Sequence, residues 1–162
     1  MGEAVSLKEI KEKLSALKRG GKRIVFTNGC FDIIHAGHVR YLKESKSLGD
    51  ILVVGLNSDV SVRAIKGSKR PVFTQEERIE VLSALNSTDY IFLFDEPTPI
   101  RLIEAVMPDI LVKGEDWEEE DIVGGDIVKG RGGKVIRVPM VEGLSTTEVI
   151  KRIVGLYARE DH

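Results

Sequence analysis

Two histidines three residues apart have the types and spacing best suited to chemistry in this chain. His35 and His38 close the stretch TNGCFDIIHAGH, residues 27–38, and the third histidine is the last residue of the chain. If this turn is helical, the two side chains share one face and can reach one ligand. Gly37 lies between them and removes a side chain where a phosphate could approach the backbone. The stretch therefore predicts a phosphate site, since two histidines and one aspartate would make a poor zinc set.

The elements that must position these histidines lie on either side of the loop. The apolar run Ile24–Phe26 predicts a buried strand over Arg23–Phe26, and the spacing beyond the loop predicts a helix from about His38 to Leu48. A strand, a glycine-bearing loop and a helix start together direct free backbone N–H groups at an anion. Neither the dinucleotide fingerprint nor the P-loop motif is present, so other groups must bind the phosphates.

The length, composition and charge of the chain are typical of a globular protein. With 162 residues, 42% of them apolar and 31% charged, the chain fits one soluble domain over residues 1–162. No apolar run reaches membrane-spanning length and the first 20 residues lack a signal-peptide core, so we expect a cytoplasmic protein that binds no membrane. The net charge of −2 gives no general electrostatic case for binding nucleic acid. The single cysteine, Cys30, excludes an intrachain disulfide.

Hydrophobic periodicity predicts strands and helices in alternation after an N-terminal helix within residues 1–20, with a catalytic core over 22–158. Further strands are expected at Ile51–Leu56, Tyr90–Phe94, Ile110–Val112 and Lys134–Val138. Further helices are expected over Gln75–Leu85, from a Thr98 cap with Pro99 in its first position, over Glu118–Lys129, and after a Ser145 cap. This order predicts an α/β fold with a Rossmann-like, parallel, five-stranded sheet and helices on both faces. The basic connection Val60–Phe73 is predicted to be a long, partly irregular, mobile lid.

Parallel sheets of this kind bind ligands beyond the C-terminal ends of their strands. Four groups of candidate residues are expected there: His35 with His38, Asn57 with Asp59, the segment Lys113–Trp117, and the segment Ser145–Thr147. Their convergence predicts a single site.

Two motifs make the chain recognisable. Residues Gly29–His38 resemble the G-x-F-D-x-x-H-x-G-H signature of the nucleotidyltransferase superfamily, and Glu142–Thr147 resembles the E-G-I-S-T-[ST] motif of its cytidylyltransferase-like branch. Within that branch, the chain is most similar to bacterial D-glycero-D-manno-heptose 1-phosphate adenylyltransferases, in their free-standing form without a kinase domain. The matching segments are Lys66–Val72, Glu77–Leu85, Asp109–Trp117 and Val141–Thr147. Glycerol-phosphate and choline-phosphate cytidylyltransferases usually carry Arg-Thr before the second motif, where this chain has Met140-Val141.

The resemblance implies transfer of AMP from ATP to heptose 1-phosphate, giving ADP-heptose and pyrophosphate, with Mg²⁺ on the triphosphate. ATP and a sugar 1-phosphate are then the small-molecule partners, and a homodimer is an open alternative to a monomer. The implied catalytic residues are His35, His38 and Lys66. The implied nucleotide-binding residues are Thr27, Asn28, Gly29, Cys30, Phe31, Gly37, Lys113, Gly114, Asp116, Trp117, Ser145, Thr146 and Thr147. The implied sugar-phosphate contacts are Asp32, Asn57, Asp59, Lys69 and Arg70, and no side chain is assigned as a metal ligand.

Two other readings stay open. The chain could be another transferase of the same superfamily, such as a glycerol-3-phosphate cytidylyltransferase or an FMN adenylyltransferase. It could also be a catalytically dead nucleotide-binding module, which turnover with any phosphate acceptor would exclude.

Overall fold

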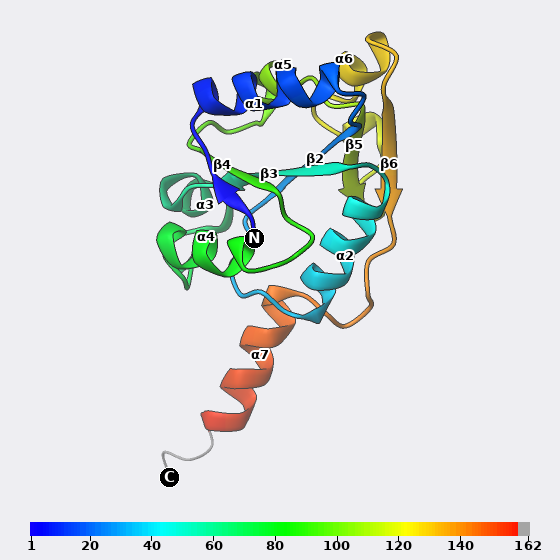
Figure 1. Ribbon diagram of the computed structural model, residues 1–162. Helices are drawn as coiled ribbons and strands as arrows, with labels where there is room; N and C mark the ends of the chain where they lie inside the picture. Colours follow the sequence, from blue (N-terminus) through cyan, green and yellow to red (C-terminus); the bar gives the residue numbers. More distant parts are fainter. Residues whose placement is uncertain (159–162) are drawn as a thin grey trace.

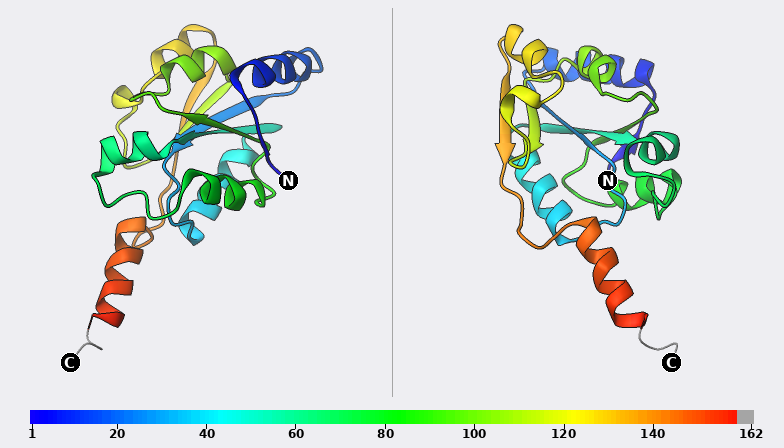
Figure 2. Two further views of the ribbon diagram at one scale, coloured as in Figure 1. Left: turned by 90° about the vertical axis from the view of Figure 1, so that its left-hand side faces the viewer. Right: turned by 180° about the vertical axis from the view of Figure 1, so that it is seen from behind.

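The computed structural model describes residues 1–158, which form a six-stranded parallel sheet between two layers of helices (Figure 1; Figure 2). The order across the sheet is β1-β4-β3-β2-β5-β6. The strands are β1 Glu3–Ala4, β2 Ile24–Gly29, β3 Ile51–Asn57, β4 Tyr90–Phe94, β5 Ile110–Gly114 and β6 Lys134–Val138. The predicted Rossmann-like α/β fold is therefore confirmed. Residues 159–162 of the predicted domain lie outside the described part of the chain, and the assignment of 1–162 to one domain stays a prediction.

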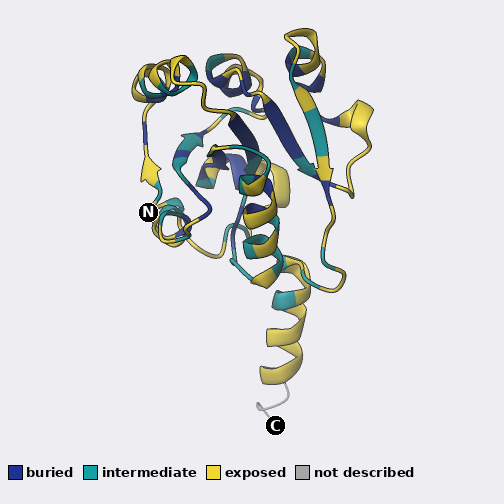
Figure 3. Cartoon of the chain, turned by 45° about the vertical axis from the view of Figure 1, so that its right-hand side comes forward, coloured by how far each residue is buried: buried dark blue, intermediate teal, exposed yellow. Residues whose placement is uncertain are grey.

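The helices cover both faces of the sheet. They are α1 Leu7–Arg19, α2 Ala36–Ser47, α3 Asp59–Lys66, α4 Gln75–Ser83, α5 Ile100–Val106, α6 Gly125–Gly130 and α7 Thr146–Tyr157. Alternate residues of β2 enter different cores: Phe26 packs with residues of α1, α5 and α6, whereas Val25 packs with residues of α2 and α4. Both faces are apolar because helices cover both, and the strands are accordingly buried in Figure 3.

The predicted count of five strands is wrong by one. The additional strand, β1, has two residues and pairs in parallel with β4 at the edge of the sheet. A two-residue strand is too short to show the alternation by which strands are recognised in a sequence. The N-terminal helix itself is confirmed as α1, with the capping box between Ser6 and Glu9.

The connection Val60–Phe73 is less irregular than predicted. Its first half belongs to α3, which begins after Ser58, whose hydroxyl accepts a hydrogen bond from the backbone N–H of Ser61. Val62 of this helix is fully buried, so α3 is packed against the body. Only the segment from Gly67 to Phe73 has the loop conformation expected for the whole connection.

Two other helix predictions need correction. The polar helix expected over Glu118–Lys129 is split into the 3-10 turn Glu119–Asp121 and α6, because Gly124 has φ +85° and interrupts it. The helix α5 begins at Ile100 with Pro99 in the cap position, and Thr98 makes no capping hydrogen bond. Among residues 1–158, no helix combines the length and the apolar character needed to cross a membrane.

The topology fixes where a ligand can bind. The chain reverses its direction of travel across the sheet at β2, which pairs with β3 on one side and with β5 on the other. The loops that follow β2 and β5 diverge at this switch point and leave a crevice beyond the strand ends. Helix α7 follows β6 and projects from the body at that end of the molecule (Figure 1).

Candidate active site

Two adjoining hollows, of about 480 and 210 Å³, lie beyond the C-terminal ends of β2 and β5. Both are bounded by the loop after β2, by Lys113 and Trp117, and by the start of α7. The predicted site residues that line one or both are Asn28, Gly29, Cys30, Phe31, Asp32, His35, Gly37, His38, Asn57, Lys66, Lys113, Gly114, Asp116, Trp117, Ser145, Thr146 and Thr147. The four predicted groups are thus represented in one place, although their roles remain predictions.

The two histidines cap the helix that they open. The Nδ1 atom of His35 accepts a hydrogen bond from the backbone N–H of Gly37 at 3.1 Å. The Nδ1 atom of His38 accepts one from the backbone N–H of His35 at 3.3 Å. The imidazole rings stack with their centroids 3.9 Å apart. Helix α2 begins at Ala36, two residues earlier than predicted, so His35 is its extended N-cap and not a helical residue, although the two rings lie side by side.

This capping arrangement determines which ring nitrogen can donate. A neutral imidazole whose Nδ1 accepts an N–H must carry its proton on Nε2. Burial lowers the pKa of His38 to about 4, and the charge of the neighbouring His35 is a second, smaller cause of this decrease. Burial also lowers the pKa of His35. Both rings are therefore neutral Nε2–H donors near pH 7. The Nε2 atom of His35 is buried and, within residues 1–158, has no hydrogen-bond partner, although buried polar atoms normally have one.

The start of α7 is the second set of donors at the hollows. The hydroxyl of Ser145 accepts a hydrogen bond from the backbone N–H of Glu148 at 3.1 Å and so caps the helix. The first N–H groups of a helix have no partner within it, and they carry a positive partial charge. Helix starts of α2 and α7 therefore border the same hollows, which is an arrangement suited to a polyphosphate.

Lys113 and Trp117 form the side of the hollows at the end of β5. The ammonium of Lys113 lies 5.2 Å from the centroid of the Trp117 ring, within cation–π range. Burial lowers the pKa of Lys113. A Cβ at Gly114 would lie 2.5 Å from the Oδ1 atom of Asp116, so a larger residue there would displace the Asp116 side chain. Trp117 is 44% exposed and lines both hollows.

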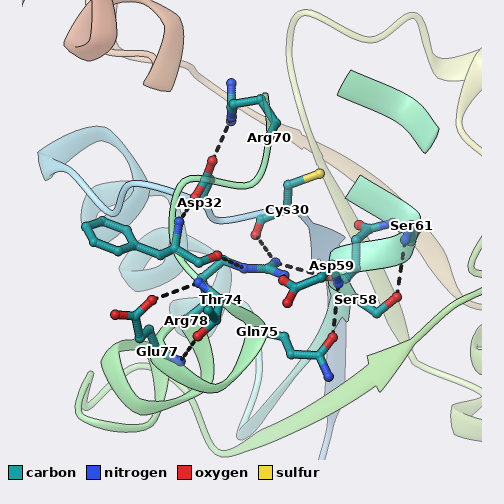
Figure 4. Close-up of polar contacts among 12 residues, drawn as sticks. Cys30, Asp32, Ser58, Asp59, Ser61, Arg70, Thr74, Gln75, Glu77 and Arg78 are labelled. Carbon is teal, nitrogen blue, oxygen red and sulfur yellow. Dashed lines mark hydrogen bonds and ion pairs between the residues drawn. The ribbon is translucent and has the colours of Figure 1, made fainter. Parts of the chain in front are cut away.

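The structure assigns Asp32 to a task other than the predicted sugar or cation contact (Figure 4). Its side chain is fully buried and accepts hydrogen bonds from the backbone N–H groups of Val72 and Phe73, and from Nε of Arg70 at 2.6 Å. Burial alone would raise the pKa of Asp32, but these hydrogen bonds lower it below its usual value. Asp32 and Arg70 thus anchor the end of the loop that follows α3.

Arg70 and three more predicted residues lie outside the lining of the two hollows, whereas Asp32 belongs to the lining of the larger one. Thr27 is fully buried, and its hydroxyl bonds to the hydroxyl of Tyr41 and to the carbonyl oxygen of Val112. The carboxylate of Asp59 pairs with the guanidinium of Arg78 at 2.9 Å. Lys69 is exposed in the loop and borders neither hollow. Thr27 and Asp59 therefore bind other residues of the protein and do not line the hollows.

Arg78 is the residue that sequence reasoning missed (Figure 4). It is 1% exposed, although it is an arginine on α4. Its guanidinium donates to the carbonyl oxygens of Cys30 and Asn57 at 2.7 Å each, and to that of Phe73 at 3.2 Å. With Asp59 as a fourth partner, one side chain joins the loop after β2, the end of β3, the start of α3 and the loop before α4. Arg78 belongs to the segment Glu77–Leu85 that matches the resembling family, which was the available signal.

The comparisons with known proteins agree with this geometry. The Cytidylyltransferase-like family model matches residues 26–152. The chain belongs to the cytidylyltransferase-like family. The matched region begins within β2 and ends within α7, so it includes both histidines and the Ser145–Thr147 segment.

Several named proteins resemble this cytidylyltransferase-like chain. "Bifunctional protein HldE" of Geobacter metallireducens is 53% identical over 147 residues, which are 91% of this chain and 30% of that protein. The protein of the same name in Campylobacter concisus is 53% identical over 148 residues, again 91% and 30%. The chain therefore spans about a third of the length of these curated relatives.

Two solved structures extend the comparison. The crystal structure of the lipopolysaccharide core biosynthesis protein from Thermoplasma volcanium GSS1 matches with a TM-score of 0.62 and 34% identity, over 75% of this chain and 98% of that one. The pantoate-beta-alanine ligase from Francisella tularensis, complexed with beta-gamma ATP and beta-alanine, gives a TM-score of 0.63 at 18% identity, over 99% of this chain and 80% of that one. The ligase shares the fold, and its low identity supports nothing further.

Replacing Gly37 by alanine is expected to weaken ATP binding roughly tenfold, about 1.4 kcal/mol, with a smaller effect on stability. A Cβ at Gly37 would lie 2.8 and 2.9 Å from the Cε1 and Nδ1 atoms of His35, so the imidazole must move. Calorimetric titration with ATP measures the change. Gly130→Ala is the matched control, because a Cβ there has no atom within 4 Å. Equal ATP affinity in wild type and a folded Gly37→Ala variant would remove Gly37 from the site.

Proposed function

We propose that this protein transfers AMP from ATP to D-glycero-D-manno-heptose 1-phosphate and releases pyrophosphate, in the cytoplasm. The observation that carries the proposal is the pair of stacked, neutral histidines in the lining of a hollow that the start of α7 also borders. The name of the Thermoplasma volcanium protein, lipopolysaccharide core biosynthesis protein, supports a sugar substrate of this kind. The segments Lys66–Val72 and Lys113–Trp117, which resemble those of heptose 1-phosphate adenylyltransferases, favour heptose 1-phosphate over glycerol 3-phosphate as the acceptor.

The chemistry is an in-line attack of a sugar phosphate oxygen on the α-phosphorus of ATP. A new P–O bond forms as the bond from the α-phosphorus to the bridging oxygen breaks, and pyrophosphate carries away that electron pair. The second pKa of a sugar phosphate is near 6, so the nucleophile is already ionised at pH 7 and needs no general base. Catalysis then consists of positioning and of neutralising charge on the phosphates.

The two histidines suit this task because they are neutral donors. We assign Nε2–H of His35 and of His38 to the α- and β-phosphate oxygens, where charge builds as the bridging oxygen leaves. The N–H groups at the start of α7, with the hydroxyls of Ser145, Thr146 and Thr147, are assigned to the β- and γ-phosphates.

The remaining groups are assigned by position. Lys66, exposed at the end of α3 and on the edge of the larger hollow, is proposed to neutralise pyrophosphate or the incoming sugar phosphate. Lys69 is a second cation for the same task if its loop moves inward, and Asn57 borders the sugar side. Trp117 and Lys113 are assigned to the base and ribose.

Magnesium fits this scheme as a companion of the triphosphate. Within residues 1–158, no three histidine, cysteine, aspartate or glutamate side chains gather where they could hold a metal ion. Asp32, the buried carboxylate nearest the histidine motif in sequence, already accepts three donors. We therefore propose that Mg²⁺ enters with ATP, held by phosphate oxygens and water.

The nucleotide choice separates this proposal from a glycerol-3-phosphate cytidylyltransferase. We expect at least a tenfold preference in kcat/KM for ATP over CTP, about 1.4 kcal/mol, because a site built to pair one base leaves polar groups unpaired with the other. Steady-state pyrophosphate release with each nucleotide, using heptose 1-phosphate and then glycerol 3-phosphate, measures both ratios. A preference for CTP with glycerol 3-phosphate would overturn the substrate assignment and leave the phosphate site intact.

The lid is now predicted to be shorter than the sequence indicated. Asp32 holds the backbone at Val72 and Phe73, so the mobile part should be residues 66–69, whose lysines repel one another without an anion. We expect hydrogen exchange to slow at residues 66–69 when ATP and magnesium bind, and to stay unchanged at 72–73. Equal exchange at 66–69 in both states would mean a rigid loop.

A further inference from the structure

A third hollow, of about 520 Å³, lies at the end of the sheet opposite the candidate active site. It surrounds the start of β5, where Pro108, Asp109 and Ile110 belong to its lining. In Figure 1, β5 and β6 begin at the end of the molecule away from α7. The volume lies within the range of small-molecule sites, about 300–1,000 Å³. The proposed reaction gives this hollow no role.

The charged side chains in the lining of this hollow are mostly positive. The lining holds one carboxylate, that of Asp109, and four cations: Lys18, Arg23, Arg131 and Lys134. This excess of three positive charges stands in a chain whose net charge is −2. The ion pairs within residues 1–158 leave all four cations without a carboxylate partner. The hollow therefore has the local charge of an anion site.

Two of the cations, Arg23 and Lys134, lie on the face of the sheet that α2 covers. A Cβ at Gly49, just after α2, would lie 3.4 Å from the Cγ atom of Arg23, which places that side chain beside the end of α2. Lys134 is the register partner of Ile110, which packs in the same core as residues of α2. The starts of β2 and β6 are two strand spacings apart, roughly 10 Å. Both side chains are exposed, so they can reach one anion between them.

The other two cations, Lys18 and Arg131, follow α1 and α6 on the opposite face. The ammonium of Lys18 donates to two carbonyl oxygens at the end of α5, at 2.8 and 2.7 Å. Burial lowers the pKa of Lys18, the charge of Asp109 raises it, and the charge of Arg131 lowers it further. Lys18 and Arg131 are thus close enough to repel each other. Asp109 offsets them only in part, and its Oδ2 atom already accepts the backbone N–H of Ile24 at 2.7 Å.

We infer that this hollow is a second ligand site, for a small organic phosphate with two negative charges. A phosphate monoester carries roughly −1.5 to −2 at pH 7 and so matches the charge excess of the lining. The planar guanidinium groups of Arg23 and Arg131 can each bind phosphate oxygens through two parallel hydrogen bonds. The apolar part of the lining is available to the rest of the ligand: Leu48, Ile103, Met107, Ile127, Val128 and Ile136.

NMR titration of the wild-type protein tests this site, because amide signals show where a probe binds. The probe is glucose 6-phosphate, and glucose is the matched molecule without the charge. We expect glucose 6-phosphate to shift the signals of residues 132–134 to saturation, with a Kd below about 1 mM. Glucose should leave these signals unchanged. The signals of residues 35–38 and 145–147 report binding at the candidate active site separately.

A double variant tests the cations. Arg23→Gln/Arg131→Gln removes one cation from each face of the sheet, and both side chains are exposed, so the variant should fold. It should raise the Kd measured at residues 132–134 by at least about tenfold. Lys8→Gln/Lys11→Gln is the matched control, because it removes the same charge from exposed positions in the first half of α1. The control should leave the Kd within about twofold of wild type.

Three results would overturn the inference. The signals of residues 132–134 could stay unchanged up to about 10 mM glucose 6-phosphate, tenfold above the expected limit. Glucose could shift them as much as its phosphate does, which would mean that the cations take no part. Finally, the double arginine variant could weaken binding no more than the control does. The inference does not depend on the proposed function: loss of ADP-heptose formation with this site intact would contradict only that function.

Discussion

Replacing His38 by alanine is expected to leave a folded protein whose kcat is lower by roughly a hundredfold or more, the usual effect of removing one transition-state donor. Burial holds the pKa of His38 at about 4, so the ring is a neutral donor and not a cation near pH 7. The variant also loses the acceptor for the backbone N–H of His35, which caps α2. We therefore expect an accompanying loss of about 1 kcal/mol in unfolding free energy. Steady-state turnover at saturating ATP, below the melting transition of the variant, measures the effect on kcat.

The matched control for this experiment is Lys43→Ala, an exposed position one turn further along α2. It should keep wild-type kcat and stability within experimental error. Turnover of the His38→Ala variant within about threefold of wild type would make His38 a capping residue only.

Replacing Arg78 by methionine is expected to cost about 3–5 kcal/mol of unfolding free energy, because it breaks a buried ion pair by removing one partner. The carbonyl oxygens of Cys30, Asn57 and Phe73 would lose their donor, and Asp59 its counter-ion. Urea unfolding measures the loss. If Arg78→Met does not fold, Arg78→Lys, which keeps the charge without the planar fork, is expected to fold with a smaller but clear loss.

Arg63→Met controls for the change of residue type, because Arg63 is exposed on α3 and its side chain makes no hydrogen bond within residues 1–158. It should stay within about 0.5 kcal/mol of wild type. If Arg78→Met lowers the unfolding free energy by less than about 1 kcal/mol, the guanidinium is not needed to hold together the loop after β2, the end of β3, the start of α3 and the loop before α4.

The sequence was sufficient to predict the helices and strands that follow a simple local pattern. The continuous apolar run at Ile51–Leu56 is β3 at the centre of the sheet, and the Ser6 and Thr74 capping boxes open α1 and α4 as expected. The histidine motif could also be placed, because a strand, a loop and a helix start are local features. Phe31 shows the limit even there, since no local pattern predicted its left-handed backbone, with φ +43°.

Two residues make long-range contacts that the sequence did not predict. Asp32 was expected to face the substrate, but its partners Val72 and Phe73 lie 40 and 41 residues away in the chain. Arg78 was named only within a segment that matches the family, and its partner Cys30 lies 48 residues away. Helix α3 was overlooked for a different reason: its basic residues favoured a lid, although Ser58 and Asp59 already supplied a helix cap and an acidic first turn.

Product analysis of a single reaction tests the central claim most directly. The purified wild-type protein would be incubated with ATP, magnesium and D-glycero-D-manno-heptose 1-phosphate, and the products resolved by mass spectrometry. We predict ADP-heptose and pyrophosphate in equal amounts, with neither formed when the sugar phosphate is omitted. Absence of any ADP-sugar from the wild type, with CDP-glycerol formed from CTP and glycerol 3-phosphate under the same conditions, would contradict the account.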